Sequence, residues 1–288
     1  MVRILGFILV PLCVIGGYMA MGGKLGVLWQ PFEVVIIVGA AIGAYMIANP
    51  VDLIKHSLHD MKDIFKGQPY QKEDYLEMLS LLYTVFKLAR TKGFLALEAH
   101  IEAPEDSEIF KAFPKFAENH HAVTFLCDYL RIISLGCENP HEMEALMDEE
   151  IDTMVEEKGH SSHAVQTMAD GMPALGIVAA VLGVIKTMGS ITEPPEVLGK
   201  LIGGALVGTF LGVWISYGFV APMANAISAR GEADVKYYKC MKVGILAFLQ
   251  GVAPQVAVEF ARKILTHDVL PTFQEVEEAT QNVPTIAT

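Results

Sequence analysis

Four stretches of the 288-residue chain contain no Asp, Glu, Lys or Arg. A hydrocarbon core about 30 Å thick needs about 20 apolar helical residues to cross it. The third of these stretches, residues 171–185, reaches that length only if its helix continues past Lys186 to about Ser190. The pattern therefore predicts four transmembrane helices, over residues 4–23, 34–51, 171–185 and 201–229. The first stretch also fits a signal peptide, but its apolar run exceeds the usual core of about 7–15 residues, which favours an uncleaved helix.

The basic residues predict the orientation of these helices. Of 21 Lys and Arg, 18 lie in residues 50–170, in residues 224–288 or at Arg3, and the other three are Lys24, Lys186 and Lys200. Loops on the cytoplasmic side carry an excess of Lys and Arg. We therefore expect both long segments and both chain termini to face the cytoplasm.

The long segments have helical periodicity. Within residues 74–99 apolar side chains recur every three or four residues, as on an amphipathic helix, until Gly93 interrupts the pattern: Leu76, Leu79, Tyr83 and Phe86. Residues 141–157 interleave eight acidic residues with apolar ones, among them Met143, Leu146, Ile151 and Val155. We interpret this run as a solvated acidic helix with an apolar seam.

The fold class that follows is all-α: a polytopic membrane protein with four transmembrane helices and a helical cytoplasmic domain. We expect transmembrane helices 1 and 2 in residues 1–49, a cytoplasmic helical domain in 50–170 and transmembrane helices 3 and 4 in 171–223. Residues 224–288 are expected to form a cytoplasmic helical segment that ends in a mobile tail from about residue 275.

Composition narrows the function. The net charge of −12 argues against nucleic-acid binding, which needs clustered Lys and Arg. The sequence contains no phosphate-binding loop or dinucleotide fingerprint. Its histidine pairs, 120–121 and 160 with 163, match no strong metal spacing, and its four cysteines are scattered, as suits a reducing compartment. We therefore expect no enzyme activity, no metal and no cofactor.

The membrane helices carry small residues and prolines. Gly204, Gly208, Gly212 and Ser216 fall every fourth residue, which allows another helix to approach closely, within one subunit or between subunits. Pro173 and Pro222 are candidate hinges, although prolines at helix ends are common. The helical rise places Ala180 and Thr209 inside the bilayer core. A lone Thr such as Thr209 more often bonds its own helix than lines a pore.

The predicted helix interiors contain no Asp, Glu or His, because Glu33 and Asp170 fall at their edges. Ion relays through membranes usually need an ionisable group at depth. If this protein conducts ions, we expect a partner chain to supply the carboxylate.

Several motifs in order resemble the MotA family of flagellar stator subunits. The residues that carry the resemblance are 171–190 (GMPALGIVAAVLGVIKTMGS), 198–224 (LGKLIGGALVGTFLGVWISYGFVAPMA), 144–152 (EALMDEEID), 128–134 (DYLRIIS) and 251–263 (GVAPQVAVEFARK). The resemblance implies a bacterial inner-membrane protein that forms a ring, held to be pentameric, around MotB helices. MotB would supply the ion-binding aspartate, and ion flow would exert torque on the rotor protein FliG.

The same resemblance assigns roles to single residues. It implies an ion path at Ala180 and Thr209, a conformational hinge at Pro173 and Pro222, and rotor contacts at Arg90 and Glu98. Glu150 matches a family acidic position of less definite role. Alanine at position 180 offers no side-chain oxygen to sodium, so we expect the transported ion to be H⁺. The rival interpretations are a TolQ/ExbB-like energiser, which resembles a three-helix protein, and a membrane scaffold without ion flow.

Overall fold

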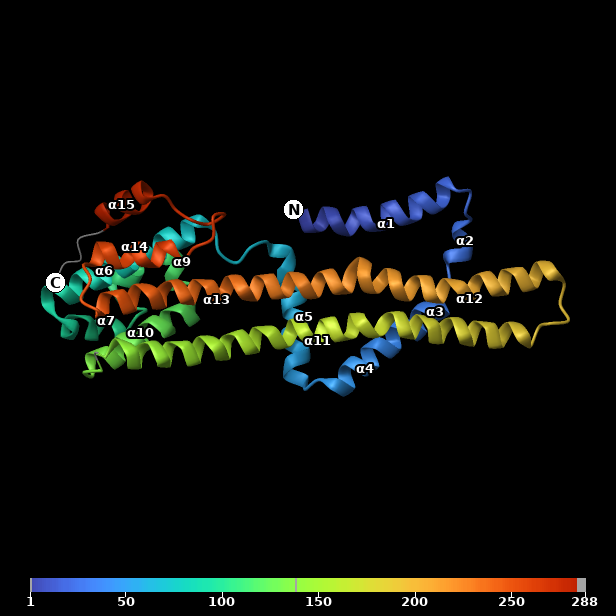
Figure 1. The fold of residues 1–288 in the computed structure, drawn as a ribbon, viewed down its shortest axis with the longest axis horizontal. Helices are drawn as coiled ribbons and strands as arrows, with labels where there is room; N and C mark the ends of the chain where they lie inside the picture. The colour runs from blue at the N-terminus through green and yellow to red at the C-terminus, as the bar shows by residue number, and fades with distance from the viewer. Residues whose placement is uncertain (1, 138, 284–288) are drawn as a thin grey trace. The chain divides into compact units, whose positions relative to one another are not determined.

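The computed structural model describes residues 2–137 and 139–283, and within these ranges it contains helices and no strand. This confirms the predicted all-α class. Packing divides the chain into two compact units, whose helices are labelled in Figure 1. The first comprises the residues up to Gly67 together with Glu157–Gly231, and the second comprises Gln68–Glu156 together with the residues from Glu232 onward. Contact therefore groups residues 50–67 and 157–170 with the apolar helices.

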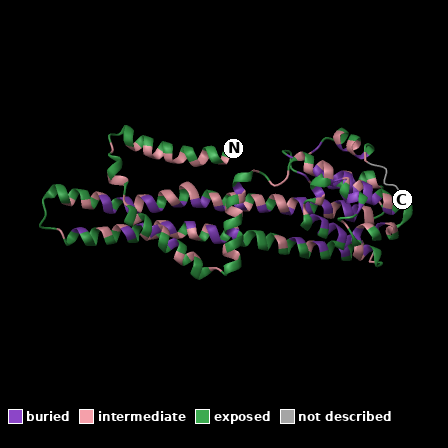
Figure 2. Cartoon of the chain, turned by 180° about the vertical axis from the view of Figure 1, so that it is seen from behind, coloured by how far each residue is buried: buried purple, intermediate pink, exposed green. Residues whose placement is uncertain are grey.

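Four helical segments are long and apolar enough to cross a membrane, which confirms the predicted number: Val2–Ala20 (α1), Leu25–Ala48, Pro140–Met188 (α11) and Pro195–Leu249. The third continues through Lys186, as its length required. None of the residues of α1 is buried, and Figure 2 shows α1 in the colours of intermediate and exposed residues. An apolar surface of this extent is typical of contact with lipid or with another subunit.

The second crossing begins earlier than the predicted residue 34. It is built from α2 (Leu25–Leu28), α3 (Pro31–Val34), a π-helical turn (Val35–Gly39) and α4 (Ala40–Ala48). Pro31 occupies the first position of α3, where a backbone N–H has no helical partner to lose. Gln30 and Glu33 therefore belong to this crossing.

The first unit also contains the paired helices α11 and α12 and the segments next to them. It contains α5 (Val51–Asp63), α12 (Pro195–Ile215), a π-helical turn (Ser216–Val220) and the first residues of α13 (Ala221–Leu249). Arg230 on α13 donates a hydrogen bond of 2.9 Å to the carbonyl of Gly67 and lies 3.8 Å from the carboxylate of Asp63. These contacts join the start of α13 to the end of α5.

The second unit packs short helices around the aromatic side chains of Phe86, Phe125 and Tyr237, all fully buried. Besides the first part of α11 and the last part of α13, this unit contains these α-helices: α6 (Lys72–Lys92), α7 (Glu98–Glu102), α8 (Glu108–Lys111), α9 (Pro114–Ala117), α10 (His120–Ser134), α14 (Pro254–Lys263) and α15 (Phe273–Gln281). The predicted helix in residues 74–99 corresponds to α6. It ends at Gly93, whose φ of 83° a glycine adopts without strain.

The acidic run is helical as predicted, but its apolar seam differs. Met143, Met147 and Ile151 are fully buried, whereas Leu146 and Val155 are 48% and 44% exposed. Side chains four residues apart share one helix face, and Leu146 falls outside it. Val155 continues the four-residue spacing from Ile151, but it lies at the end of this part of the second unit, which stops at Glu156. The prediction was wrong at these two positions.

The C-terminal segment contains one more helix. α15 begins after a capping box in which Thr272 and Glu275 bind each other's backbone N–H groups. It continues to Gln281, into the range expected to be mobile. Residues 284–288 lie outside the described residues.

Candidate functional site

The paired helices α11 and α12 approach each other through glycine backbone. A Cβ built on Gly176 would lie 2.9 Å from the carbonyl oxygen of Gly208 and 3.1 Å from Cα of Gly212. A side chain at position 176 would therefore meet backbone that cannot rotate away. The small-residue stripe packs within the subunit here, and packing between subunits stays a prediction.

The two predicted ion-path residues lie on facing helices of this pair. Ala180 on α11 and Thr209 on α12 are both half-buried. A Cβ built on Gly208 would lie 3.1 Å from the backbone nitrogen of Ala180, and Thr209 directly follows Gly208. The structure thus brings Ala180 close to the turn of α12 that carries Thr209.

The two predicted hinge prolines are connected through one serine. Pro173 lies inside α11 and has no N–H, so the carbonyl of Ala169, four residues earlier, loses its helical donor. The hydroxyl of Ser216, a fully buried residue, donates a hydrogen bond of 2.6 Å to that carbonyl. Ser216 also begins the π-helical turn that immediately precedes α13, in which Pro222 is the second residue.

This arrangement explains why both helices remain continuous at their prolines. The buried hydroxyl satisfies the carbonyl that Pro173 leaves open. The π-helical turn widens the second helix where the ring of Pro222 would otherwise meet the carbonyl of Gly218. In the sequence Ser216 stands out only as a small residue, because its position opposite Pro173 depends on how the two helices align.

The structure shows which residues surround Glu33. The sequence places its carboxyl group at the edge of a membrane helix, and in the structure the two carboxylate oxygens lie beside Gly183 on α11 and Gly208 on α12. A Cβ at Gly208 would be 2.7 Å from Glu33 Oε2, and a Cβ at Gly183 would be 3.6 Å from Oε1. Oε2 is buried and has no hydrogen-bond partner among the described residues. The irregular start of the second crossing brings this carboxylate against α12, and the sequence did not predict that contact.

The side chain of Gln30 packs against Gly204, the preceding glycine of the same stripe. A Cβ at Gly204 would lie 2.9 Å from Gln30 Nε2, which donates a weak hydrogen bond of 3.3 Å to the carbonyl of Val27. Glycines one turn apart on α12 therefore provide space for two polar side chains from the second crossing.

The predicted rotor-contact residues flank the turn after α6. Arg90, in the last turn of α6, is exposed, and its Nη1 donates hydrogen bonds of 3.2 and 3.1 Å to the carbonyls of Gly251 and Val252. A guanidinium near the C-terminal end of α13 is favourable because carbonyl groups concentrate negative charge there. Glu98 is the exposed first residue of α7. Arg90 thus also anchors the chain that follows α13.

Glu150 lies on the exposed side of α11, and its Oε2 accepts a hydrogen bond of 2.5 Å from the hydroxyl of Tyr129 on α10. Burial, together with this hydrogen bond to the carboxylate, raises the pKa of Tyr129 above its usual value. The tyrosine therefore remains a neutral donor and fixes Glu150 to α10.

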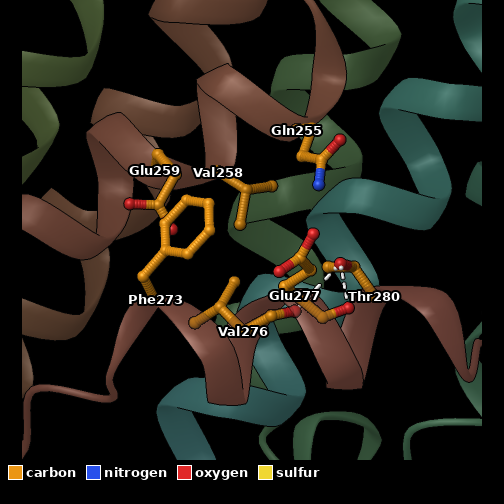
Figure 3. Close-up of a pocket in the computed structure, with 7 residues that line it drawn as sticks. All are labelled: Gln255, Val258, Glu259, Phe273, Val276, Glu277 and Thr280. Carbon is orange, nitrogen blue, oxygen red and sulfur yellow. Dashed lines mark hydrogen bonds between the residues drawn. The ribbon is translucent and has the colours of Figure 1, made fainter.

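A shallow pocket between α14 and α15 in the second unit offers little for chemistry (Figure 3). It encloses about 210 Å³, open solvent included, and its lining is Gln255, Val258, Glu259, Phe273, Val276, Glu277 and Thr280. The hydroxyl of Thr280 donates to the carbonyls of Val276 and Glu277 within α15. Across the described part of the chain, no three His, Cys, Asp or Glu residues cluster closely enough to hold a metal ion.

Comparison with protein-family models gives two matches. The model described as motility protein A N-terminal matches residues 4–93, and the model of the MotA/TolQ/ExbB proton channel family matches residues 117–239. Together they include both helices of the glycine-packed pair and Glu33.

Individual proteins agree with these matches. The chain is 42% identical to motility protein A of Escherichia coli strain K12 over 278 residues, which cover 96% of this chain and 94% of the relative. Its fold resembles the flagellar MotAB stator complex from Bacillus subtilis, with a TM-score of 0.73, 25% identity and coverage of 93% and 97% of the two chains. It also resembles C. jejuni MotAB, with a TM-score of 0.76, 21% identity and coverage of 92% and 95%.

Proposed function

Because the chain belongs to the motility protein A family of flagellar stator subunits, we propose that it pairs with MotB to form a proton channel that drives rotation of the motor. The observation that carries this proposal is the α11–α12 pair, where Ala180, Thr209 and Glu33 all lie close to Gly208. The match to a motility protein A N-terminal model over residues 4–93 favours this function over a TolQ/ExbB-like energiser.

MotB supplies the aspartate that binds the ion beside Ala180 and Thr209. Several copies of this chain, five in the expected ring, surround the MotB helices within the bacterial inner membrane. The exposed apolar faces of α1 and α12 support such an assembly, because lipid or neighbouring subunits can cover them.

The transported ion is the proton. Sodium binds best to oxygen ligands, and the methyl group of Ala180 provides none. If this is right, rotation stops when the proton gradient collapses and continues when sodium is removed. Rotation that requires sodium while the proton gradient is intact would contradict the proposal.

Torque passes to FliG through Arg90 and Glu98, which are exposed on the second unit. Movement in the membrane pair arises at Pro173 and Pro222. Exposed charge pairs contribute only about 0–1 kcal/mol each. Charge reversal at Glu98 should therefore reduce torque without lowering the amount of protein in the membrane. Glu98→Lys that fails to accumulate would instead identify a structural residue.

The decisive test is a strain that lacks this gene. We expect normal filaments that do not rotate, with rotation restored by the wild-type gene but not by a Pro173→Ala variant present at the same membrane level. Filaments that rotate normally in the deletion strain, without a second stator, would contradict the stator role.

A further inference from the structure

Glu33 is the one acidic side chain that the second crossing brings against the glycine stripe of α12, among the described residues. Its two oxygens lie between backbone of Gly183 and backbone of Gly208, with the nitrogen of Ala180 at the same position. The sequence and its family resemblance assign it no role.

The surroundings of Glu33 provide no donor for Oε2. An ionised carboxylate only accepts hydrogen bonds, and a buried one without a partner is costly. The glycines that face it contribute no side chain. The charged group that follows on α11 is Lys186, three residues beyond Gly183, while residues 201–209 of α12 contain no titratable group. Oε2 is therefore free to bind a proton.

We propose that Glu33 is a proton-transfer carboxyl group, which receives protons from the outer side and passes them to the MotB aspartate beside Ala180 and Thr209. This inference rests on the proposed function as a proton channel. In each cycle a proton binds Oε2 and forms an O–H bond. That bond then breaks, the proton joins the MotB carboxylate, and Glu33 returns to its ionised form.

The position along the helices supports access from the outer side. Gly183 lies within one helical turn of Lys186, one of three basic residues that the charge distribution assigns to the outer face. Gln30 lies one turn further toward the start of α12, at Gly204, and extends the polar lining in that direction. Gln30 and Glu33 thus form a polar strip that ends close to Ala180.

The test is the rotation of single motors at low and high load. When the load is low, speed depends on how quickly ions pass, whereas near stall torque depends on the energy released by each ion. Glu33→Gln keeps the shape of the side chain but cannot exchange a proton as a carboxyl group does. We expect it to slow rotation at low load several-fold and to change torque at high load little. Glu33→Asp should restore part of the speed.

The matched control is Glu196→Gln, which removes an exposed carboxylate near the start of the same helix, α12, and should behave as wild type. Wild-type speed at low load in Glu33→Gln would overturn the proposal. The proposal would also fail if Glu33→Gln and Glu33→Asp both lost speed equally at low and high load and both bound MotB less well. Glu33 would then be a structural residue. Wild-type motors driven by sodium instead of protons would reject the proposed function as well. That result comes from the wild type and not from a Glu33 variant, so the two failures are distinguishable.

Discussion

Ser216 satisfies a carbonyl group that a proline has deprived of its helical donor. Replacing Ser216 by Ala leaves the buried carbonyl of Ala169 unpaired, which costs about 1–3 kcal/mol. We expect Ser216→Ala to lower the thermal unfolding midpoint of the purified protein in detergent. The control is Thr167→Ala on α11, the helix that also carries Ala169. It removes an exposed hydroxyl bonded to the carbonyl of His163 and should change the midpoint little.

The coupling between Ser216 and Pro173 can be measured separately. Pro173→Ala restores the N–H that binds the carbonyl of Ala169, so a second change at Ser216 should then cost less. A double-mutant cycle should give a coupling energy of about 0.5–3 kcal/mol. Equal costs of Ser216→Ala in both backgrounds would show that the hydroxyl does not compensate for the proline.

Tyr129 determines how Glu150 is held. Tyr129→Phe removes the hydrogen bond to Glu150 and should lower stability by about 0.5–1.5 kcal/mol, because the exposed carboxylate can bind water instead. Glu150→Gln made in the Tyr129→Phe background should then have a smaller effect on unfolding than in the wild type. Additive effects in denaturant unfolding would contradict this link.

The α11–α12 pair depends on the close approach at Gly176. Gly176→Ala places a methyl group 2.9 Å from the carbonyl oxygen of Gly208, so the helices must separate, at a cost of about 1–3 kcal/mol. We expect reduced thermal stability and reduced swimming. Gly171→Ala on the same helix is the control: its added methyl has open space, and it should be tolerated. Equal effects of the two changes would indicate that helix propensity, not packing, matters.

The docking of α15 to α6 should weaken in acid. Hydrogen bonds from Lys72 and from Thr272 lower the pKa of Glu275 to about 2, compared with 4.5 for a free Glu side chain. This contribution to stability is complete above the unfolded pKa and disappears as the pH falls through the folded pKa. Glu275→Gln should therefore flatten the decline of the unfolding midpoint between about pH 5 and pH 2. Glu278→Gln controls for the loss of one charge from α15, and an identical decline in Glu275→Gln would contradict the prediction.

The helices that could be predicted from the sequence are those fixed by local pattern. Charge-free stretches predict four crossings because hydrocarbon tolerates few charges, and Gly93 marks the end of α6 because glycine readily adopts a positive φ. The seam of the acidic helix was only partly predictable, since several apolar spacings fit a helical period. The surroundings of Glu33 and Ser216 depend on which helices pack together, and no local pattern encodes that.

The distribution of charge over the chain has one further consequence, for how the protein lies in the membrane. Because 18 of the 21 basic residues belong to the termini and the two long segments, we expect these parts to face the cytoplasm. The connection between α11 and α12 must then be outside, because three crossings separate it from the N-terminus and one from the C-terminus, and an odd number of crossings changes the side. A single new cysteine in each place can distinguish the two sides.

Glu193→Cys in that connection and Lys92→Cys at the end of α6 both place a thiol at an exposed position. The background is a variant with Cys13 and Cys137 replaced, because Cys127 and Cys240 are already buried. A maleimide that cannot cross membranes should label Glu193→Cys in spheroplasts, and should label Lys92→Cys only after lysis. The opposite result would reverse the orientation and place Arg90 and Glu98 on the side of the membrane where no rotor could reach them.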